Sequence, residues 1–319
     1  MKLIGIGKCV PERVVTNDEL SNFVDTSDEW IVTRTGIKER RLTLGQNTSD
    51  LASIAAQRAI DMAKISAEDI DLIIVSTVTP DYFTPSTACV VQKNIGAKNA
   101  ACFDLNAGCT GLIYGLVTAD AMLKTLNYRY ALIIGAETLS KIVDWNDRNT
   151  CVLFGDGASA CVVEASKDGV LSMYLSSEGE KGKYLECNGL PLRNILIQNT
   201  WDSFVRMDGR EVFKFATNAI VKCIDILLKD ANLQKDDIAY IVPHQANIRI
   251  IDYAADKTGI GRDKFYVNID KYGNTSSASI GIALCEMYEK GMLKKDDKVV
   301  LVGFGGGLTS GGLIINWSI

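Results

Sequence analysis

Short apolar runs rich in β-branched residues recur along the chain, separated by polar or small-residue segments. Four of them, at 70–75, 130–135, 238–242 and 298–303, show little alternation between apolar and polar positions. Runs of this length are typical of strands that are buried on both faces, in a sheet covered by helices on each side. The pattern therefore predicts an α/β protein in which small-residue helices connect these strands.

The second half of the chain repeats the first at an offset of 168 residues. Three blocks match at this offset: 63–74 with 231–242, 105–116 with 273–284, and 132–135 with 300–303. Apolar runs overlay by chance in any α/β protein, but three blocks that share one offset favour a duplication. We expect two similar halves, 1–168 and 169–319, about a pseudo-twofold axis, in five layers ordered helix, sheet, helix, sheet, helix.

Composition and charge narrow the class of protein. The 319 residues include 34 Lys+Arg and 39 Asp+Glu, a formal net charge of -5, without a basic run. Nucleic acid and anionic membrane surfaces are therefore not expected partners. No apolar stretch approaches the roughly 18 residues of a spanning helix, and the first apolar run is too short for a signal peptide. We expect a cytoplasmic protein that is not inserted in a membrane.

Cysteine and histidine usage limits the possible chemistry. Nine cysteines at irregular spacing, with no C-x-x-C pair, argue against a disulfide framework and a zinc ribbon. The single histidine, His244, excludes any mechanism or metal site that needs two imidazoles. No metal site of that kind is therefore expected.

Cys109 is the candidate nucleophile. It lies where an apolar strand at 100–105 gives way to a helix rich in small residues. A thiol in the first turn of a helix faces unpaired N–H groups and the positive end of the dipole, which should lower its pKa. The alternative is a buried packing cysteine, and that is the only interpretation offered for Cys151, Cys161 and Cys223.

His244 and Asn274 are the candidate partners of this thiol. His244 follows the strand at 238–242, and ligands bind at the carboxyl end of parallel strands. Asn274 lies in a turn that leads into a helix, where a capping role is the alternative. Because the repeat places the Asn274 turn over the Cys109 turn, the pseudo-twofold axis should gather the three residues about one cleft.

A glycine run follows the last core strand, as Gly303-Phe-Gly-Gly-Gly307. It is too short and too C-terminal for a dinucleotide-binding loop. Such a turn lets a backbone N–H approach a reacting carbonyl, and together with the N–H of Cys109 it would form an oxyanion hole. A tight connection between strands is the alternative.

With these residues in view, the sequence resembles the β-ketoacyl-[acyl-carrier-protein] synthase III family of the thiolase superfamily along essentially its whole length. Six motifs carry the resemblance in the family's order: 24–37, 104–116, 154–158, 242–247, 273–276 and 304–307. The family uses a Cys-His-Asn triad, and a chain with one histidine agrees with that triad rather than with Cys-His-His. The resemblance implies a thiolase-like fold.

The resemblance also implies an activity, the initiating condensation of fatty acid biosynthesis. Cys109 would take an acyl group from an acyl-CoA, either acetyl or somewhat longer. Malonyl-[acyl-carrier protein] would then lose CO2, and its enolate would attack the acyl-enzyme to give 3-oxoacyl-[acyl-carrier protein]. His244 and Asn274 would donate hydrogen bonds to the malonyl thioester oxygen, and Gly306 would supply the second oxyanion N–H. Phe304 would make the surroundings of the carboxylate apolar.

Binding residues follow from the same resemblance. The CoA-binding set is Thr26, Trp30, Arg34, Arg148 and Asn247, with Trp30 and Arg148 on either side of the adenine. The structural alternative for Thr26 is that it caps a helix, with Glu29 three residues later as its capping-box partner. The carrier-protein set is Lys214, Gln245, Arg249 and Lys257, although Asp256 stands where a second lysine is often found. Acyl-CoA is a substrate here, not a cofactor.

The acyl pocket is expected to include Thr84 as well as Phe304. Aligned on Pro85-Ser86, Thr84 occupies a position that the family often fills with Phe, which closes the pocket around acetyl groups. Phe83, or side chains of a partner subunit, could fill the same space. The family also implies a homodimer.

Two other functions fit part of the pattern. A papain-like cysteine hydrolase also uses Cys, His and Asn with its His about 130 to 150 residues after the Cys, but its C-G-[SA]-C-[WY] motif is absent here. A relative with this triad could condense or esterify other acyl groups in specialised metabolism. A silent binding subunit is disfavoured because all three reactive residues are present.

Overall fold

Two β-sheets, one from each half of the chain, form the centre of the molecule in the computed structural model, which describes residues 1–319. The first has the order β1-β7-β6-β4-β5 and the second the order β11-β12-β13-β8. The strands of the first sheet are β1 (Lys2–Cys9), β4 (Leu72–Ser76), β5 (Ala101–Leu105), β6 (Tyr130–Glu137) and β7 (Gly157–Glu164). Those of the second are β8 (Val170–Ser177), β11 (Ile238–Pro243), β12 (Lys298–Gly305) and β13 (Thr309–Asn316).

The two sheets have the same topology. In the first, β1-β7 and β7-β6 are antiparallel, whereas β6-β4 and β4-β5 are parallel. In the second, β8-β13 and β13-β12 are antiparallel and β12-β11 is parallel. An isolated parallel bridge between Ile241 and Phe265 stands in the place of β5. The strand directions therefore agree with the duplication expected from the sequence.

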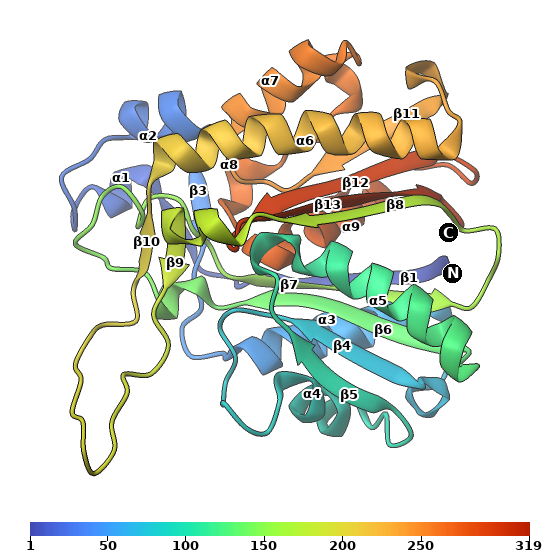
Figure 1. Cartoon of the computed structure of the whole chain (residues 1–319), viewed down its shortest axis with the longest axis horizontal. Helices are drawn as coiled ribbons and strands as arrows, with labels where there is room; N and C mark the ends of the chain where they lie inside the picture. The colour runs from blue at the N-terminus through green and yellow to red at the C-terminus, as the bar shows by residue number, and fades with distance from the viewer.

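Helices cover and separate the sheets (Figure 1). α3 (Thr48–Ala63) and α4 (Thr87–Ile95) lie on the outer face of the first sheet, and α6 (Gly209–Ala231) and α7 (Ile248–Thr258) lie outside the second. α5 (Gly111–Leu126) and α9 (Ser279–Glu289) lie between the two sheets. The predicted order of five layers is confirmed.

Side-chain size sets the distance between α3 and the first sheet. The buried face of α3 consists largely of alanines, and it crosses the two glycines of β1. A Cβ built on Gly7 would lie 2.2 Å from the carbonyl oxygen of Ala55. Because 2.2 Å is far below a van der Waals contact, any larger residue at position 7 would push the backbone of α3 away from the sheet.

Smaller elements complete the face that carries the site. The strands β2 (Val14–Thr16) and β3 (Glu39–Arg41) pair in a short antiparallel ribbon. Three short helices lie next to this ribbon: α1 (Asn17–Leu20), α2 (Asp28–Thr35) and α8 (Ile269–Tyr272). A second antiparallel pair consists of β9 (Leu185–Cys187) and β10 (Val205–Met207). The acidic segments at 67–69 and 235–237 each form a single 3₁₀ turn. Two further 3₁₀ turns, η2 (Gly108–Thr110) and η7 (Ser276–Ala278), begin the helices α5 and α9 and match at the offset of 168.

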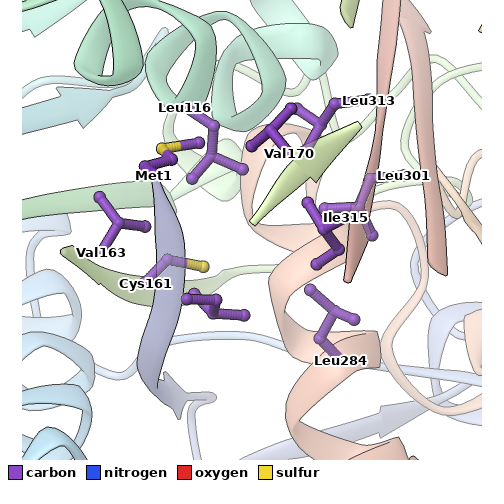
Figure 2. A pocket seen from close by; sticks show the side chains of 10 residues that line it. Met1, Leu116, Cys161, Val163, Val170, Leu284, Leu301, Leu313 and Ile315 are labelled. Carbon is purple, nitrogen blue, oxygen red and sulfur yellow. The ribbon is translucent and has the colours of Figure 1, made fainter. Parts of the chain in front are cut away.

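The space between the two sheets holds no room for a ligand. A void of about 10 Å³ lies there, lined by ten hydrophobic residues. Figure 2 shows Met1, Leu116, Leu284 and Ile315 around it. A void of that size is about one water in volume and offers no polar partner, so it is a packing defect rather than a site. None of the helices is both long and apolar enough to cross a membrane.

Candidate active site

A cavity of about 360 Å³ opens at the carboxyl ends of the central strands and contains all three residues of the expected triad. Its lining residues are Trp30, Arg34, Thr35, Cys109, Asp147, Asn149, Val152, Leu153, Phe154, Leu185, Met207, Gly209, Val212, Phe213, His244, Ala246, Asn247, Ile250, Asn274, Phe304 and Gly305. One continuous space thus joins Cys109 to Trp30 and Arg34, which belong to the expected CoA site.

Cys109 lies in the turn η2, between β5 and α5, and is 9% exposed. The backbone N–H groups of Gly306 and of Cys109 itself both act to lower the pKa of this thiol. The backbone of Gly305 comes so close that an added Cβ would lie 2.7 Å from the Cβ of Cys109. The glycine run therefore places a second N–H beside the sulfur, where an oxyanion hole for a thioester carbonyl requires it.

The pKa of Cys109 differs from the sequence expectation. Burial raises it to about 11, although hydrogen bonds from the Ser276 hydroxyl and from the two N–H groups act in the opposite direction. The first turn of a helix was expected to lower this pKa, and that expectation is wrong because desolvation of the thiolate outweighs the hydrogen bonds. At neutral pH the free thiol keeps its proton, so acylation requires a proton acceptor.

His244 follows β11 and is 1% exposed. Its Nδ1 lies 2.7 Å from the hydroxyl oxygen of Ser279, which also accepts the N–H of Gln245 at 3.4 Å. This contact fits the tautomer with the ring proton on Nε2, in which the Ser279 hydroxyl donates to Nδ1. Burial lowers the pKa of His244 to about 3, so the imidazole is neutral and acts as a donor through Nε2. The edge of its ring packs against Phe304, with 5.4 Å between centroids.

Asn274 is held by its backbone on one side and by its side-chain oxygen on the other. Its N–H donates to the carbonyl of Leu153 at 2.8 Å, and its own carbonyl accepts the N–H of Gly155 at 3.0 Å. Its Oδ1 accepts the N–H of Ser276 at 2.8 Å. Since the oxygen is occupied, the Nδ2 amide group is left to donate into the cavity.

The mouth of the cavity is cationic and aromatic. The guanidinium carbons of Arg34 and Arg148 lie 4.5 and 4.7 Å from the centroid of the Trp30 ring. Asn247 donates to the carbonyl of Arg34 at 2.9 Å and so ties α7 to α2. Trp30, Arg34 and Asn247 line the cavity, whereas Arg148 sits directly on the indole and must move aside for a ring to enter between them.

Thr26 does not cap α2. The cap is Ser27, whose hydroxyl accepts the N–H of Trp30 at 3.2 Å. The capping box expected for Thr26 and Glu29 is therefore wrong by one residue. The Thr26 hydroxyl is buried without a hydrogen-bond partner, and Thr26 is not among the residues that line the cavity.

The carrier-protein set divides into exposed and buried residues. Lys214 on α6, and Arg249 and Lys257 on α7, are exposed. Gln245 is 1% exposed, and its amide bonds to Pro243, Tyr266 and Asn268 inside the fold. Its expected contact with a carrier protein is therefore wrong.

Thr84 lies away from the cavity of its own chain. It is exposed on the loop between β4 and α4 and is absent from the cavity lining, whereas Phe304 is 2% exposed and lines the cavity beside His244. Within a single subunit the two expected acyl-pocket residues are not brought together.

Two residues near the triad were not identified from the sequence. The hydroxyl oxygen of Ser279 lies 2.7 Å from Nδ1 of His244, and the hydroxyl of Ser276 acts to lower the pKa of Cys109. Both belong to the run Thr275-Ser-Ser-Ala-Ser279, which follows Asn274 directly. The closely spaced hydroxyl residues that begin in the 273–276 motif were the sequence signal that could have identified them.

Comparison with known proteins agrees with the geometry of this cavity. A model of the family 3-oxoacyl-[acyl-carrier-protein (ACP)] synthase III matches residues 103–179, and its C-terminal counterpart matches 228–317. A β-ketoacyl-[acyl-carrier-protein] synthase III of Clostridium acetobutylicum is 52% identical over 324 residues, which cover 100% of this chain and 99% of that protein. The chain belongs to this family.

Solved structures of synthase III proteins share the whole architecture. That of 3-oxoacyl-[acyl-carrier-protein] synthase III from Aquifex aeolicus has a TM-score of 0.93 and 43% identity, with 99% of both chains covered. The priming β-ketosynthase of the R1128 polyketide pathway follows at a TM-score of 0.92 and 31% identity, over 99% of this chain and 96% of that one. The fold is thus thiolase-like, and the papain-like alternative is excluded. As a synthase III, the chain is an acyltransferase of fatty acid biosynthesis that carries out the initiating condensation.

Proposed function

We propose that the chain condenses an acyl-CoA primer with malonyl-[acyl-carrier protein], releasing CoA, CO2 and 3-oxoacyl-[acyl-carrier protein]. The observation that carries this proposal is the single cavity that joins Cys109, His244 and Asn274 to Trp30 and Arg34 at its mouth. A thioester extended along it would have its carbonyl at the sulfur and its nucleotide at the mouth.

Acylation uses the thiol and the two backbone donors. The sulfur of Cys109 attacks the carbonyl carbon of the acyl-CoA, and the N–H groups of Cys109 and Gly306 stabilise the oxyanion of the tetrahedral intermediate. Collapse of that intermediate breaks the bond to CoA and leaves the acyl group on the protein.

Decarboxylation uses the two side-chain donors. Nε2 of His244 and Nδ2 of Asn274 donate to the malonyl thioester oxygen, where negative charge develops as CO2 leaves. Because the imidazole is neutral and buried, it stabilises the enolate without transferring a proton. The ring of Phe304, packed on the imidazole, keeps water from the carboxylate.

Intact-mass measurement tests the overall reaction. The protein is incubated with acetyl-, butyryl- and hexanoyl-CoA, and malonyl-[acyl-carrier protein] is then added. We expect one acyl group per chain, followed by its loss and the appearance of 3-oxoacyl-[acyl-carrier protein]. No mass increase with any acyl-CoA would contradict the proposal.

The CoA contacts are tested at the mouth of the cavity. Trp30→Ala and Arg148→Ala should each raise KM for acyl-CoA about tenfold and leave kcat nearly unchanged, because stacking on a base contributes about 1–3 kcal/mol and acts equally on ground and transition states. Arg129→Ala is the matched control and should leave KM unchanged. Arg129 also lies 4.7 Å from the centroid of an aromatic ring, that of Tyr130, but Tyr130 begins β6 and so lies at the end of that strand far from the cavity. Unchanged KM in both mouth variants would place the nucleotide elsewhere.

The exposed cations Lys214, Arg249 and Lys257 are proposed to attract the acidic carrier protein. Arg249 lies 5.6 Å from the ring of Phe213, which lines the cavity, so its charge stands beside the entrance. Lys257 is paired with Asp256 at 3.6 Å, which weakens its contribution. Arg249 and Lys214 should therefore provide most of the attraction.

A homodimer in the cytoplasm is proposed as the working form. β5 is an edge strand of the first sheet. The loop between β4 and α4 exposes two aromatic side chains, Tyr82 at 57% and Phe83 at 80%. The loop between β9 and β10 exposes several more, including Ile195 and Leu196. Exposed apolar surface and an open sheet edge both favour association with a second copy.

The dimer also gives Thr84 a route to an acyl pocket, because its exposed loop could only line the cavity of a neighbouring copy. On this basis Thr84→Phe should lower kcat/KM for butyryl- and hexanoyl-CoA about tenfold relative to acetyl-CoA, since each buried CH2 contributes about 0.8 kcal/mol. Parallel assays of the three primers measure this ratio, with Thr125→Phe, at an exposed position near the end of α5, as control. A ratio equal to that of the wild type would remove Thr84 from the pocket.

A further inference from the structure

The proposed oxyanion hole is assembled from two segments that are far apart in the chain. One is the turn η2, which carries the N–H of Cys109, and the other is the glycine run at 305–307, which leads from β12 into β13 and carries the N–H of Gly306. A Cβ added to Gly108 would lie 3.0 Å from the backbone nitrogen of Gly306. One added to Gly305 would lie 2.8 Å from the backbone nitrogen of Cys109. The two N–H groups therefore lie close together, as a hole for one carbonyl oxygen requires.

The glycines do not fix the position of these segments by themselves. Gly305, Gly306 and Gly307 have no side chains to pack, and Gly307 has a φ of 133°, a conformation that other residues rarely adopt. The turn η2 also begins with such a residue, since Gly108 has a φ of 54°. Because glycine backbone is the most permissive of all, a fixed spacing between the two N–H groups requires an anchor from another part of the fold.

The hydroxyl of Thr309, the first residue of β13, bonds to both segments. Its Oγ1 lies 3.0 Å from the carbonyl oxygen of Gly306 and 3.1 Å from that of Ala107, which precedes η2. It also bonds to the hydroxyl of Thr110, the last residue of η2. Both threonines are buried, so water does not compete for these bonds. One hydroxyl thus contacts both ends of the turn that carries Cys109 and the residue that supplies the second N–H.

The protons of this cluster can be assigned without conflict. Each threonine hydroxyl has one proton to donate. The two carbonyl oxygens can only accept, and since they lie at nearly equal distances from Oγ1, the Thr309 proton is shared between them in a three-centre bond. The Thr110 hydroxyl has no other acceptor and donates to Oγ1 of Thr309. Loss of the Thr309 hydroxyl would therefore release the Gly306 carbonyl and leave the Thr110 hydroxyl buried without an acceptor.

We propose that Thr309 is a positioning residue, which holds the N–H groups of Cys109 and Gly306 at the separation that binds a thioester oxygen. Thr309 does not line the cavity, so it acts through the two backbone segments rather than on the substrate. It also pairs with Gly305 in the ladder between β12 and β13. The strand pairing therefore fixes the chain before Gly306, and the hydroxyl fixes its carbonyl. This inference rests on the proposed acylation of Cys109.

Infrared spectroscopy of the acyl-enzyme tests this role directly. The protein is acylated with acetyl-CoA that is isotope-labelled at the carbonyl carbon, in the absence of malonyl-[acyl-carrier protein]. The difference between labelled and unlabelled samples then gives the C=O stretch of the thioester on Cys109. Hydrogen bonds to the carbonyl oxygen weaken the C=O bond and lower this frequency. Thr309→Val keeps the shape of the side chain without its hydroxyl and should shift the stretch to higher frequency, whereas Thr309→Ser should restore the wild-type value.

The rate of single-turnover acylation gives a second measurement. Thr309→Val should be about tenfold slower at saturating acyl-CoA with an unchanged KM, because both donors remain but are less well placed and the contacts at the mouth are untouched. Thr110→Val should change the stretch and the rate in the same direction. Thr258→Val is the matched control and should behave as the wild type. Thr258 is also buried, and its hydroxyl also donates to a backbone carbonyl, that of Ala254 in α7 at 2.7 Å.

A purely structural role gives a different result. Loss of stability lowers the amount of folded protein but leaves the hydrogen bonds to the thioester unchanged in the molecules that remain folded. A stretch at the wild-type frequency in Thr309→Val would therefore overturn the proposal whatever the rate, and so would a shift that Thr309→Ser does not reverse. Should Thr309→Val fail to fold or to take up the acyl group, the stretch in Thr110→Val decides. A wild type that takes up no acyl group would contradict the proposed function instead.

Discussion

Cys109→Ala should abolish transfer of the acyl group from acyl-CoA to the protein. A methyl group offers no nucleophile, and no other cysteine lines the cavity. The substitution should leave the fold intact, because alanine keeps the Cβ that packs against Gly305 and only the sulfur is removed. Incubation with radiolabelled acetyl-CoA, followed by denaturing separation, should therefore find label on the wild type and background on the variant.

A second buried cysteine supplies the control for that experiment. Cys161→Ala removes a sulfur that is 1% exposed in the core between the sheets, and it should keep full labelling unless the protein unfolds. Thermal unfolding of both variants separates loss of chemistry from loss of structure. Stable label on Cys109→Ala would show that the nucleophile is another residue.

His244→Ala and Asn274→Ala should leave acylation of Cys109 largely intact while malonyl decarboxylation falls about 100-fold or more. Removal of one donor to a developing oxyanion costs about 10²–10³ in rate. In the proposed mechanism neither side chain takes part in the attack of the thiol, because the backbone N–H groups of Cys109 and Gly306 hold the oxyanion of the first step. The two steps are measured separately, as acyl uptake by mass and as release of labelled CO2 from malonyl-[acyl-carrier protein].

The ionisation of His244 makes this prediction more specific. Since the pKa of the imidazole lies at about 3, the decarboxylation step should show no titration of a histidine between pH 5 and 8. Asn94→Ala, on the exposed face of α4, is the control and should behave as the wild type. Normal decarboxylation in either triad variant would refute the enolate-stabilising role.

Patterns that are local in sequence determined the architecture. The uninterrupted apolar runs indicate strands that are buried on both faces, and the single offset of 168 residues indicates a duplication. Together these two patterns predicted five layers and two matching sheets. The repeat also brought the Asn274 turn over the Cys109 turn, and one cavity lined by both residues agrees with that placement. These features depend on periodicity along the chain, which the sequence displays directly.

Solvation and contacts between distant segments were decided only by the tertiary structure. Burial of Cys109 reversed the expected direction of its pKa, and the closing of the fold around Gln245 removed it from the surface. The hydroxyl of Ser276 and the carboxyl group of Glu137, 139 residues apart in the chain, form a hydrogen bond only because the two halves pack together. The sequence by itself determined which residues could do the chemistry, whereas the packed structure set their protonation, since the loss of water around a group depends on all the segments that surround it.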